Sequence, residues 1–511
     1  MISSHLSPSY WSSNAPCIAS AFQIQASVSV PQQLSTNHHD VDKIETLVKD
    51  KLDRIATSYQ TVHGEKLRRT VDVELELCHK IEKCFMGANA IEDESTQNLL
   101  LSTKLNEKKC RLEECLAVND RAVHQLLATN SDGGQSSSSL FHHVDFITSA
   151  AAEAGSTSVG EYDDLGQLMG NGGLVEGGES NKETDGYDTA LQVIHHTARD
   201  WTHGAASCRE ETIMWIVRAI VQYYTQDRSS NDGPHHPLRV LIPGAGLGRL
   251  AYEVSTCRDL IENRVMPRVE ANDSSVTMIF AAQSVIKMLQ EQQHESRQLQ
   301  SAIHPFLSDP QVNEIDARKR FEMEVFPDQH AIDSYKYYHD LTGTNPNLSF
   351  TIGDFVSTYS QQSKQNQYDV VATSFFIDTA TNIYEYIYIM KHMLDTNGIW
   401  VNCGPVQWHP CALLRPTVEQ LKDMLQVAGF DLISWSIADE AVAYRHPDDV
   451  GGAGSEEARY TRSEAYRPLR FVARLLASQD DDGNCNDEDL ALKIQYSEFL
   501  NEVANGKIEV N

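Results

Sequence analysis

The sequence predicts an α/β domain with a mostly parallel sheet, preceded by a helical region, and three observations support this fold class. Strand-like apolar runs alternate with segments of helical spacing between residues 189 and 478, as expected for parallel βαβ units. A glycine-rich loop, Gly244-Ala-Gly-Leu-Gly248, directly follows the first of these apolar runs. Between residues 41 and 129, apolar residues recur at the spacing of one helix face.

Changes in composition divide the chain into five regions. Residues 1–40 are rich in Ser and contain no Lys or Arg, so we predict a disordered tail without a signal or transit peptide. Residues 41–129 form the N-terminal helical region, and residues 130–188, rich in Gly, Ser and acidic residues, are a low-complexity insertion or linker. The α/β domain covers residues 189–478. An acidic tail, residues 479–511, follows it.

Composition excludes several classes of protein. The 511 residues include 42 Lys plus Arg against 72 Asp plus Glu, a net charge of −30, which argues against a surface that neutralises nucleic-acid phosphates. Ten cysteines are scattered without a CxxC pair or zinc-ligand spacing, which indicates reduced thiols and no metal site. No apolar run approaches the roughly 18 residues of a membrane span. We therefore expect no membrane association and a location in the cytosol or the nucleus.

The elements of the α/β domain follow one another in a regular order. A helix over 190–201 precedes Ser207-Cys-Arg-Glu210, which predicts a capping box ahead of a second helix. The remaining expected elements are strands at 238–242, 268–273, 348–352, 368–376, 398–404, 432–442 and 468–476, and helices from 250, at 275–289, at 383–394 and at 418–428. The polar segment 290–345 is expected to be rich in loops.

The glycine loop is the first candidate for ligand binding. Gly244 and Gly246 permit a close backbone approach and a sharp turn into the next helix. The dinucleotide fingerprint is GxGxxG, whereas here the glycines alternate, so a cofactor without phosphates fits better than NAD. A tight turn without a ligand is the alternative. Asp273, which ends the second strand, is the candidate for the ribose hydroxyls; Glu270 is its rival, and either could be a solvated acid.

Polar residues follow three further strands at the same predicted edge. Asp354 and Phe355, in Gly353-Asp-Phe355, could bind an adenine amino group and its ring, although an Asp-capped turn explains Asp354 equally well. Asp378 follows a strongly apolar strand, where a carboxylate is costly unless it has a partner or a function. His409 falls on the same rim, where a lone histidine is more often structural.

Five strings taken together resemble the carnosine N-methyltransferase family, in order from about Val193 to Leu475. They are Val240-Leu-Ile-Pro-Gly-Ala-Gly-Leu-Gly-Arg-Leu-Ala251, Ala271-Asn-Asp-Ser-Ser275, Gly353-Asp-Phe355, Phe375-Phe-Ile-Asp-Thr-Ala-Thr-Asn382 and Gly398-Ile-Trp-Val-Asn-Cys-Gly-Pro405. The resemblance implies a Rossmann-like class I methyltransferase with a seven-stranded sheet. It also implies methyl transfer from S-adenosylmethionine to an imidazole nitrogen of carnosine, which yields anserine.

The resemblance implies roles for individual residues. Arg199, Gly244, Asp354 and Phe355 match cofactor-binding positions, as does Asp273, where the family has Glu. His196 stands where the family has Gln, and Ser374 where it has Cys. For the substrate, Asp378 and His409 match the family's carnosine-binding Asp and His, and Tyr444 and Tyr466 match two later tyrosines. The stretch between these tyrosines, which contains residues 447–454, diverges from the family.

This resemblance predicts a mechanism in which Asp378 accepts the N–H of one imidazole nitrogen, so that the other nitrogen presents its lone pair to the methyl group. His409 would help to hold the ring. The expected partner is a small histidine-containing peptide, and homodimerisation remains open. A protein-histidine methyltransferase and a non-catalytic, methyltransferase-like binding protein are the alternatives.

Overall fold

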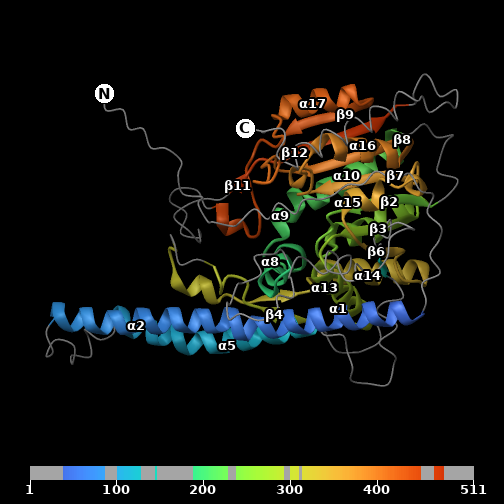
Figure 1. Cartoon of the computed structure of the whole chain (residues 1–511). Coiled ribbons are helices and arrows are strands. Elements are labelled where there is room, and N and C mark those ends of the chain that lie inside the picture. Colours follow the sequence, from blue (N-terminus) through green and yellow to red (C-terminus); the bar gives the residue numbers. More distant parts are fainter. Residues whose placement is uncertain are drawn as a thin grey trace, which may run out of the picture.

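The computed structural model describes residues 38–86, 100–127, 144–146, 188–227, 237–292, 300–309, 314–450 and 465–476. The predicted tail at 1–40 and the insertion at 130–188 lie almost wholly outside these residues, and the acidic tail at 479–511 lies wholly outside them. Figure 1 shows a sheet flanked by helices, with a long helical rod across one end. No helix in the described part of the chain is both long enough and apolar enough to cross a membrane.

The main sheet confirms the predicted α/β class. Among the described residues it has eight strands in the order β1-β6-β3-β2-β7-β8-β12-β9, with the last two pairings antiparallel and the rest parallel. Their bounds are β1 (Val144–Phe146), β2 (Leu238–Pro243), β3 (Pro267–Asp273), β6 (Leu348–Ile352), β7 (Tyr368–Ser374), β8 (Leu394–Gly404), β9 (Phe430–Ile437) and β12 (Leu469–Leu475). Seven are the predicted strands. The eighth, β1, falls within the predicted insertion and is too short for a periodic signal.

The strand order places a ligand-binding crevice between β2 and β7. The chain runs outward from β2 to β3 and β6, then returns to β7 on the other side of β2. In open α/β sheets, ligands bind outside the carboxyl ends of the strands where the order reverses. The residues directly after these two strands therefore lie at the expected site.

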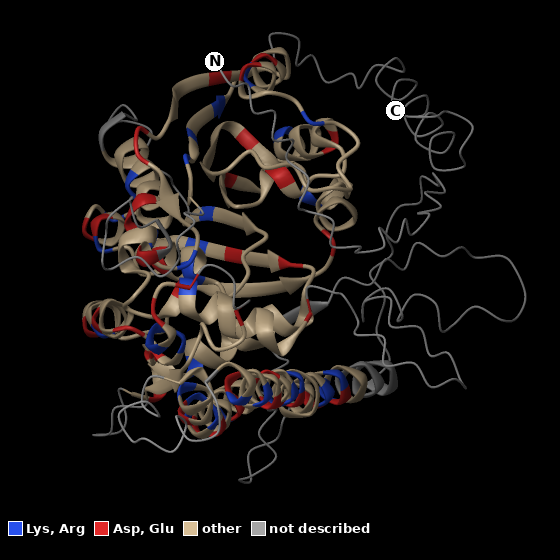
Figure 2. Cartoon of the chain, turned by 90° about the vertical axis from the view of Figure 1, so that its left-hand side faces the viewer, with Lys and Arg blue, Asp and Glu red and all other residues tan. Residues whose placement is uncertain are grey.

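Helices cover both faces of the sheet. They are α8 (Ala190–Trp201), α9 (Ala206–Glu211), α10 (Ile213–Gln222), α11 (Arg249–Ser255), α12 (Arg258–Glu262), α13 (Val276–Glu291), α14 (Gln329–Thr342), α15 (Phe355–Tyr359), α16 (Ile383–Met393) and α17 (Val418–Val427). Shorter turns are η2 (Tyr223–Asp227), η3 (Ala317–Phe321), η4 (Gln362–Lys364), η5 (Ile377–Thr379) and η6 (Pro447–Val450). Figure 2 shows the charged residues gathered mainly on the outer helices, whereas the strands are mostly uncharged.

Two local predictions are wrong. The expected capping box at 207–210 does not form: α9 begins after Ala205 without a side-chain cap, and the chain breaks at Thr212 before α10 begins. The segment 290–345 contains the antiparallel pair β4 (Ser301–Ile303) and β5 (Glu324–Phe326) and the fourteen-residue helix α14. Few residues of α14 are buried, so its apolar pattern is too weak to announce a helix.

The N-terminal rod lies along the α/β domain rather than apart from it. It consists of α1 (His38–Ser58), η1 (Tyr59–Gly64), α2 (Glu65–Met86) and α5 (Leu101–Leu127). Asn119 of α5 donates 2.7 and 3.0 Å hydrogen bonds to the Tyr59 hydroxyl and the His304 carbonyl. Lys51 pairs with Asp188 at 2.6 Å. The bond to His304 ties the rod to the residue just after β4, and the Lys51 pair ties it to the segment just before α8.

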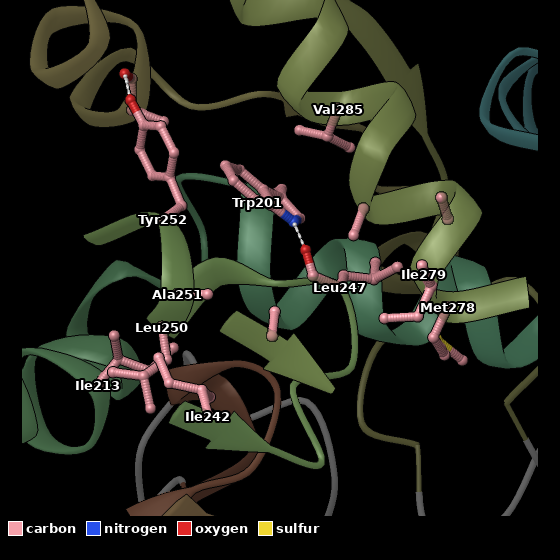
Figure 3. Close-up of a cluster of buried hydrophobic side chains, with 14 of the residues drawn as sticks. Trp201, Ile213, Ile242, Leu247, Leu250, Ala251, Tyr252, Met278, Ile279 and Val285 are labelled. Atoms are coloured by element: carbon pink, nitrogen blue, oxygen red, sulfur yellow. Dashed lines mark hydrogen bonds between the residues drawn. The ribbon is translucent and has the colours of Figure 1, made fainter. Parts of the chain in front are cut away.

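The core beside β2 fixes the start of α11. The indole N–H of Trp201 donates to the Leu247 carbonyl at 3.0 Å, as Figure 3 shows. Arg249 lies over the Trp201 ring, 5.0 Å from its centroid, and pairs with Glu253 and Asp328. Helix α8 and the glycine loop are therefore packed directly against each other.

A second two-stranded sheet lies between β9 and β12 in the sequence. Its strands β10 (Val442–Ala443) and β11 (Ala465–Tyr466) pair antiparallel. We call residues 438–448 and 465–468 the arm. The arm carries both of the tyrosines that the sequence singled out.

Candidate active site

The glycine loop turns sharply between β2 and α11. Gly244, Gly246 and Gly248 have φ angles of 62°, 54° and 76°, in the left-handed region that favours glycine. A Cβ atom on Gly244 would lie 2.3 Å from Cδ2 of Phe376, and one on Gly246 would lie 3.5 Å from nitrogens of Arg199 and His196. Both positions therefore require glycine for the predicted close approach.

Asp273 lies at the carboxyl end of β3 and contacts this loop. Its carboxylate accepts hydrogen bonds from the N–H of Gly246 at 2.9 Å and of Ser275 at 2.8 Å. Burial raises the pKa of Asp273 to about 6, although these N–H groups oppose the shift. The rival acid Glu270 instead accepts bonds from the hydroxyls of Tyr359 and Tyr368. Of the two acids, Asp273 is the one at the predicted site.

His196 and Arg199 reach the loop from α8. His196 is buried, and burial holds its pKa well below the usual value, with the Arg199 charge acting in the same direction. The Arg199 guanidinium donates to both carboxylate oxygens of Asp200, at 2.6 and 3.0 Å. It also donates to the Tyr444 hydroxyl at 2.6 Å. The guanidinium is thus oriented by groups on both sides.

Asp354 and Phe355 follow β6, the strand next to β3 in the sheet. Asp354 is exposed and caps α15 by accepting the Ser357 N–H at 2.9 Å, so the capped turn does form. Phe355 is buried and makes edge contacts with Phe376 and Tyr386, with ring centroids 5.2 and 4.9 Å apart. An adenine ring packed here would meet an aromatic cluster beside an exposed carboxylate.

A cavity opens between the glycine loop, α8–α10, the end of β7 and the arm. Five of the predicted site residues line it: Arg199, Gly244, Ser374, Tyr444 and Tyr466. The Ser374 Oγ and the Tyr466 hydroxyl are buried and have no hydrogen-bond partner among the described residues. Buried polar atoms without partners are costly. Both atoms are therefore available to a polar ligand.

Asp378 and His409 are not among the residues that line this cavity. Asp378 is buried in η5, where its Oδ2 accepts the Gln407 N–H at 3.0 Å and its carbonyl accepts the His409 N–H at 3.0 Å. Burial raises the pKa of Asp378, opposed by the Gln407 N–H and the His409 charge. The His409 side chain is exposed. The loops after β7 and β8 are thus joined through Asp378.

The sequence did not point to several residues of this site. Cys208 and Arg209 line the cavity from α9, and Thr212 lines it from the break between α9 and α10. The capping pattern at 207–210 predicts one continuous helix and gives no sign of that break. Phe375 also lines it. The apolar pattern predicts a strand over 368–376, which includes Phe375 and therefore gives this residue no separate role.

Taken together, the strand order, the glycine loop after β2 and the acid at the end of β3 define the fold of the class I methyltransferases. Comparison with known proteins narrows this class. The family model described as carnosine N-methyltransferase matches residues 178–443, just over half of the chain. The chain therefore belongs to the carnosine N-methyltransferase family.

Individual relatives and solved structures are distant. The mouse carnosine N-methyltransferase is 28% identical over 254 residues, which cover 48% of this chain and 55% of the mouse protein. The fission-yeast carnosine N-methyltransferase is 24% identical over 264 residues, 48% of this chain and 63% of that protein. The match thus spans between half and two thirds of these relatives. A Methanosarcina mazei S-adenosylmethionine-dependent methyltransferase of known structure covers 51% of this chain and 98% of its own, with 10% identity and a TM-score of 0.29.

Proposed function

We propose that this protein is an S-adenosylmethionine-dependent N-methyltransferase that methylates an imidazole nitrogen of carnosine, giving anserine, or of a related histidine-containing dipeptide. The observation that carries the proposal is the Asp378 carboxylate. It is buried in η5, where its Oδ2 accepts the Gln407 N–H at 3.0 Å, and a carboxylate has acceptor capacity for an imidazole N–H as well. Family membership supports the same acceptor.

The residues present fit S-adenosylmethionine. A Cβ on Gly244 would clash with Phe376, Gly246 has a left-handed φ, and the buried Ser374 Oγ has no hydrogen-bond partner among the described residues. We infer that Asp273 accepts hydrogen bonds from the ribose hydroxyls and that Asp354 and Phe355 bind the adenine. Arg199, with His196 beside it, would pair with the carboxylate of the cofactor's methionine part. When bound, this cofactor supplies a methyl group already activated on a positively charged sulfur.

The protein's task is then to orient a neutral imidazole. Asp378 accepts the N–H of one ring nitrogen, which selects the tautomer whose other nitrogen carries a lone pair. The same carboxylate stabilises the positive charge that the ring gains. We infer that His409, Tyr444 and Tyr466 contact the ring and the polar groups of the peptide. Correct placement of two reactants can supply much of the rate enhancement.

Composition supports the proposed kind of substrate and the proposed location. The net charge of −30 favours a small substrate over a nucleic acid. We infer that the protein acts in the cytosol or the nucleus, where the scattered cysteines would stay reduced. The eight described cysteines are free thiols.

A labelled-methyl assay tests the proposal. The full chain would be incubated with labelled S-adenosylmethionine and carnosine, homocarnosine, Gly-His or histidine-bearing proteins in parallel. We expect label on carnosine or a related dipeptide, at an imidazole nitrogen. Label on proteins alone would instead identify a protein-histidine methyltransferase, and cofactor binding with no label on any acceptor would identify a non-catalytic binding protein.

A further inference from the structure

Phe375, the first residue after β7, has an unusual backbone. Its φ angle is 54°, in the left-handed region. The other non-glycine residues with positive φ among those described are Arg264, Asn366 and Asn397, and asparagine adopts this conformation more readily than other residue types. A phenylalanine has no polar side chain to compensate. Strained residues of this kind persist where the surrounding structure holds them, and they cluster at functional sites.

Three separate parts of the chain hold Phe375 in place. Gly404 at the end of β8 makes room, because a Cβ there would lie 2.8 Å from the Phe375 nitrogen. The rings of Tyr444 and Tyr466 meet the Phe375 ring edge to face, with centroids 5.1 and 5.2 Å away. The Arg199 guanidinium lies 5.5 Å from the ring centroid. The side chain remains partly exposed in the cavity.

The left-handed turn decides what the ring does. Ser374 lines the cavity, whereas Phe376 points into the core and is buried against the glycine loop. The turn at Phe375 brings a second consecutive side chain into the cavity, three residues before Asp378. Its ring already receives a cation, since the guanidinium of Arg199 lies over it and over Tyr444.

Methyl transfer would place a positive charge beside this ring. The lone pair of the imidazole nitrogen forms the new N–C bond while the electrons of the broken C–S bond return to sulfur. The positive charge therefore moves from sulfur to the imidazole, where it stays until the N–H proton is released to Asp378 or water. The face of an aromatic ring attracts cations, most strongly where water is excluded.

We propose that Phe375 is an acceptor-binding residue: its ring packs against the substrate imidazole and stabilises the charge that the imidazole gains. The inference rests on the proposed function and extends it, since it assigns recognition of a flat ring to a residue beside Asp378. The backbone strain at Phe375 is the conformational cost of presenting that ring.

Three variants of the full-length protein separate this role from packing. Phe375→Leu keeps the apolar bulk and the strain but removes the ring, and we expect it to raise KM for carnosine about tenfold or more, the scale of a lost cation–π or stacking contact. Phe375→Tyr keeps the ring and should raise KM less. Phe375→Asn tolerates the positive φ, so its Tm should equal or exceed that of the Leu variant, although Asn is less apolar. Affinity for S-adenosylhomocysteine, measured by calorimetry, should stay within about threefold of wild type in all three.

The outcomes distinguish the two proposals. A wild-type chain that methylates none of the dipeptides refutes the proposed function, and the role of Phe375 with it. A wild-type chain that does methylate carnosine, with Phe375→Leu within threefold of its KM, refutes the role of Phe375 alone. The role of Phe375 is also refuted if Phe375→Leu weakens the binding of S-adenosylhomocysteine as much as that of carnosine, because the ring would then only support the cavity wall.

Discussion

The guanidinium of Arg199 donates a 2.6 Å hydrogen bond to the hydroxyl of Tyr444, 245 residues further along the chain. The same guanidinium lies 5.0 Å from the Tyr444 ring centroid. Arg199 lies on α8, before β2, and Tyr444 belongs to the arm between β9 and β12. Helix α8, which carries a predicted cofactor residue, and the arm, which carries a predicted substrate residue, thus meet at the cavity.

Replacement of Arg199 should weaken cofactor binding. Arg199→Met keeps the length of the side chain but removes its charge and donors, and hydrogen bonds to charged groups contribute about 1.5–3 kcal/mol. We expect Kd for S-adenosylhomocysteine to rise by roughly 10- to 100-fold in calorimetry. Tyr444→Phe, which removes only the hydroxyl, is the matched control and should change this Kd much less. Equal effects in the two variants would contradict a direct role of Arg199 toward the cofactor.

Asp378→Asn should slow turnover with little effect on cofactor affinity. An amide can donate where the carboxylate must accept, and it carries no charge to stabilise the imidazolium, so we expect kcat to fall about 100-fold or more. Calorimetry with S-adenosylhomocysteine should show Kd within about twofold of wild type. Asp423→Asn, at an exposed position on α17, should leave both values unchanged. An unaltered kcat in Asp378→Asn would contradict the proposed mechanism.

Cofactor affinity should depend on pH through Asp273. Burial raises the pKa of this carboxyl to about 6, and ribose hydroxyls donate best to its charged form. Affinity should therefore be constant above pH 6 and decrease as pH falls through 6, approaching tenfold per pH unit at lower pH. Calorimetry between pH 5 and 8 tests this. Asp273→Asn should bind more weakly but without that pH dependence; an unchanged profile would assign the titration to another group.

Arg249 should matter for stability rather than for chemistry. It is 2% exposed, and its charge lowers the pKa of Glu253 to about 2 even though burial opposes that shift. Arg249→Met would leave Glu253 and Asp328 buried beside fewer positive charges, which typically costs about 3–5 kcal/mol of unfolding free energy. Urea denaturation measures the loss. Arg258→Met, which breaks the exposed pair with Glu262, should leave the urea midpoint almost unchanged, because solvent screens this pair.

Asp309 should position the arm for substrate. Its carboxylate accepts two hydrogen bonds from Arg445, at 2.9 and 2.6 Å, and lies 3.5 Å from His195 on α8. Asp309→Asn weakens this anchor next to Tyr444, so we expect KM for carnosine to rise about fivefold, roughly 1 kcal/mol, with cofactor affinity retained. Steady-state kinetics separate the two. Arg474→Met, which breaks the exposed pair with Asp431, should leave KM unchanged; a loss of cofactor affinity in Asp309→Asn would show that the anchor supports α8 instead.

Much of the α/β domain could be predicted from local pattern. Strands β2 and β7 are mostly apolar because both of their faces are buried, and the glycine loop marks the turn after β2. The segment 290–345 gave a misleading signal, because α14 buries few of its residues and β4 and β5 have three residues each. The break at Thr212 was missed for a different reason: a capping pattern can occur in the sequence without the backbone using it.

The sequence by itself determined the class of sheet, the glycine loop and most of the candidate site residues, because these depend on residue type and on order along one chain. Only the tertiary structure decided how they meet. It separated Asp273 from Glu270, which lie on one strand but bond to different neighbours. It also joined Arg199 to Tyr444 and turned Phe375 into the cavity. Such contacts join residues far apart in the sequence, or depend on a backbone conformation that the amino-acid type disfavours, and so leave no periodic signal.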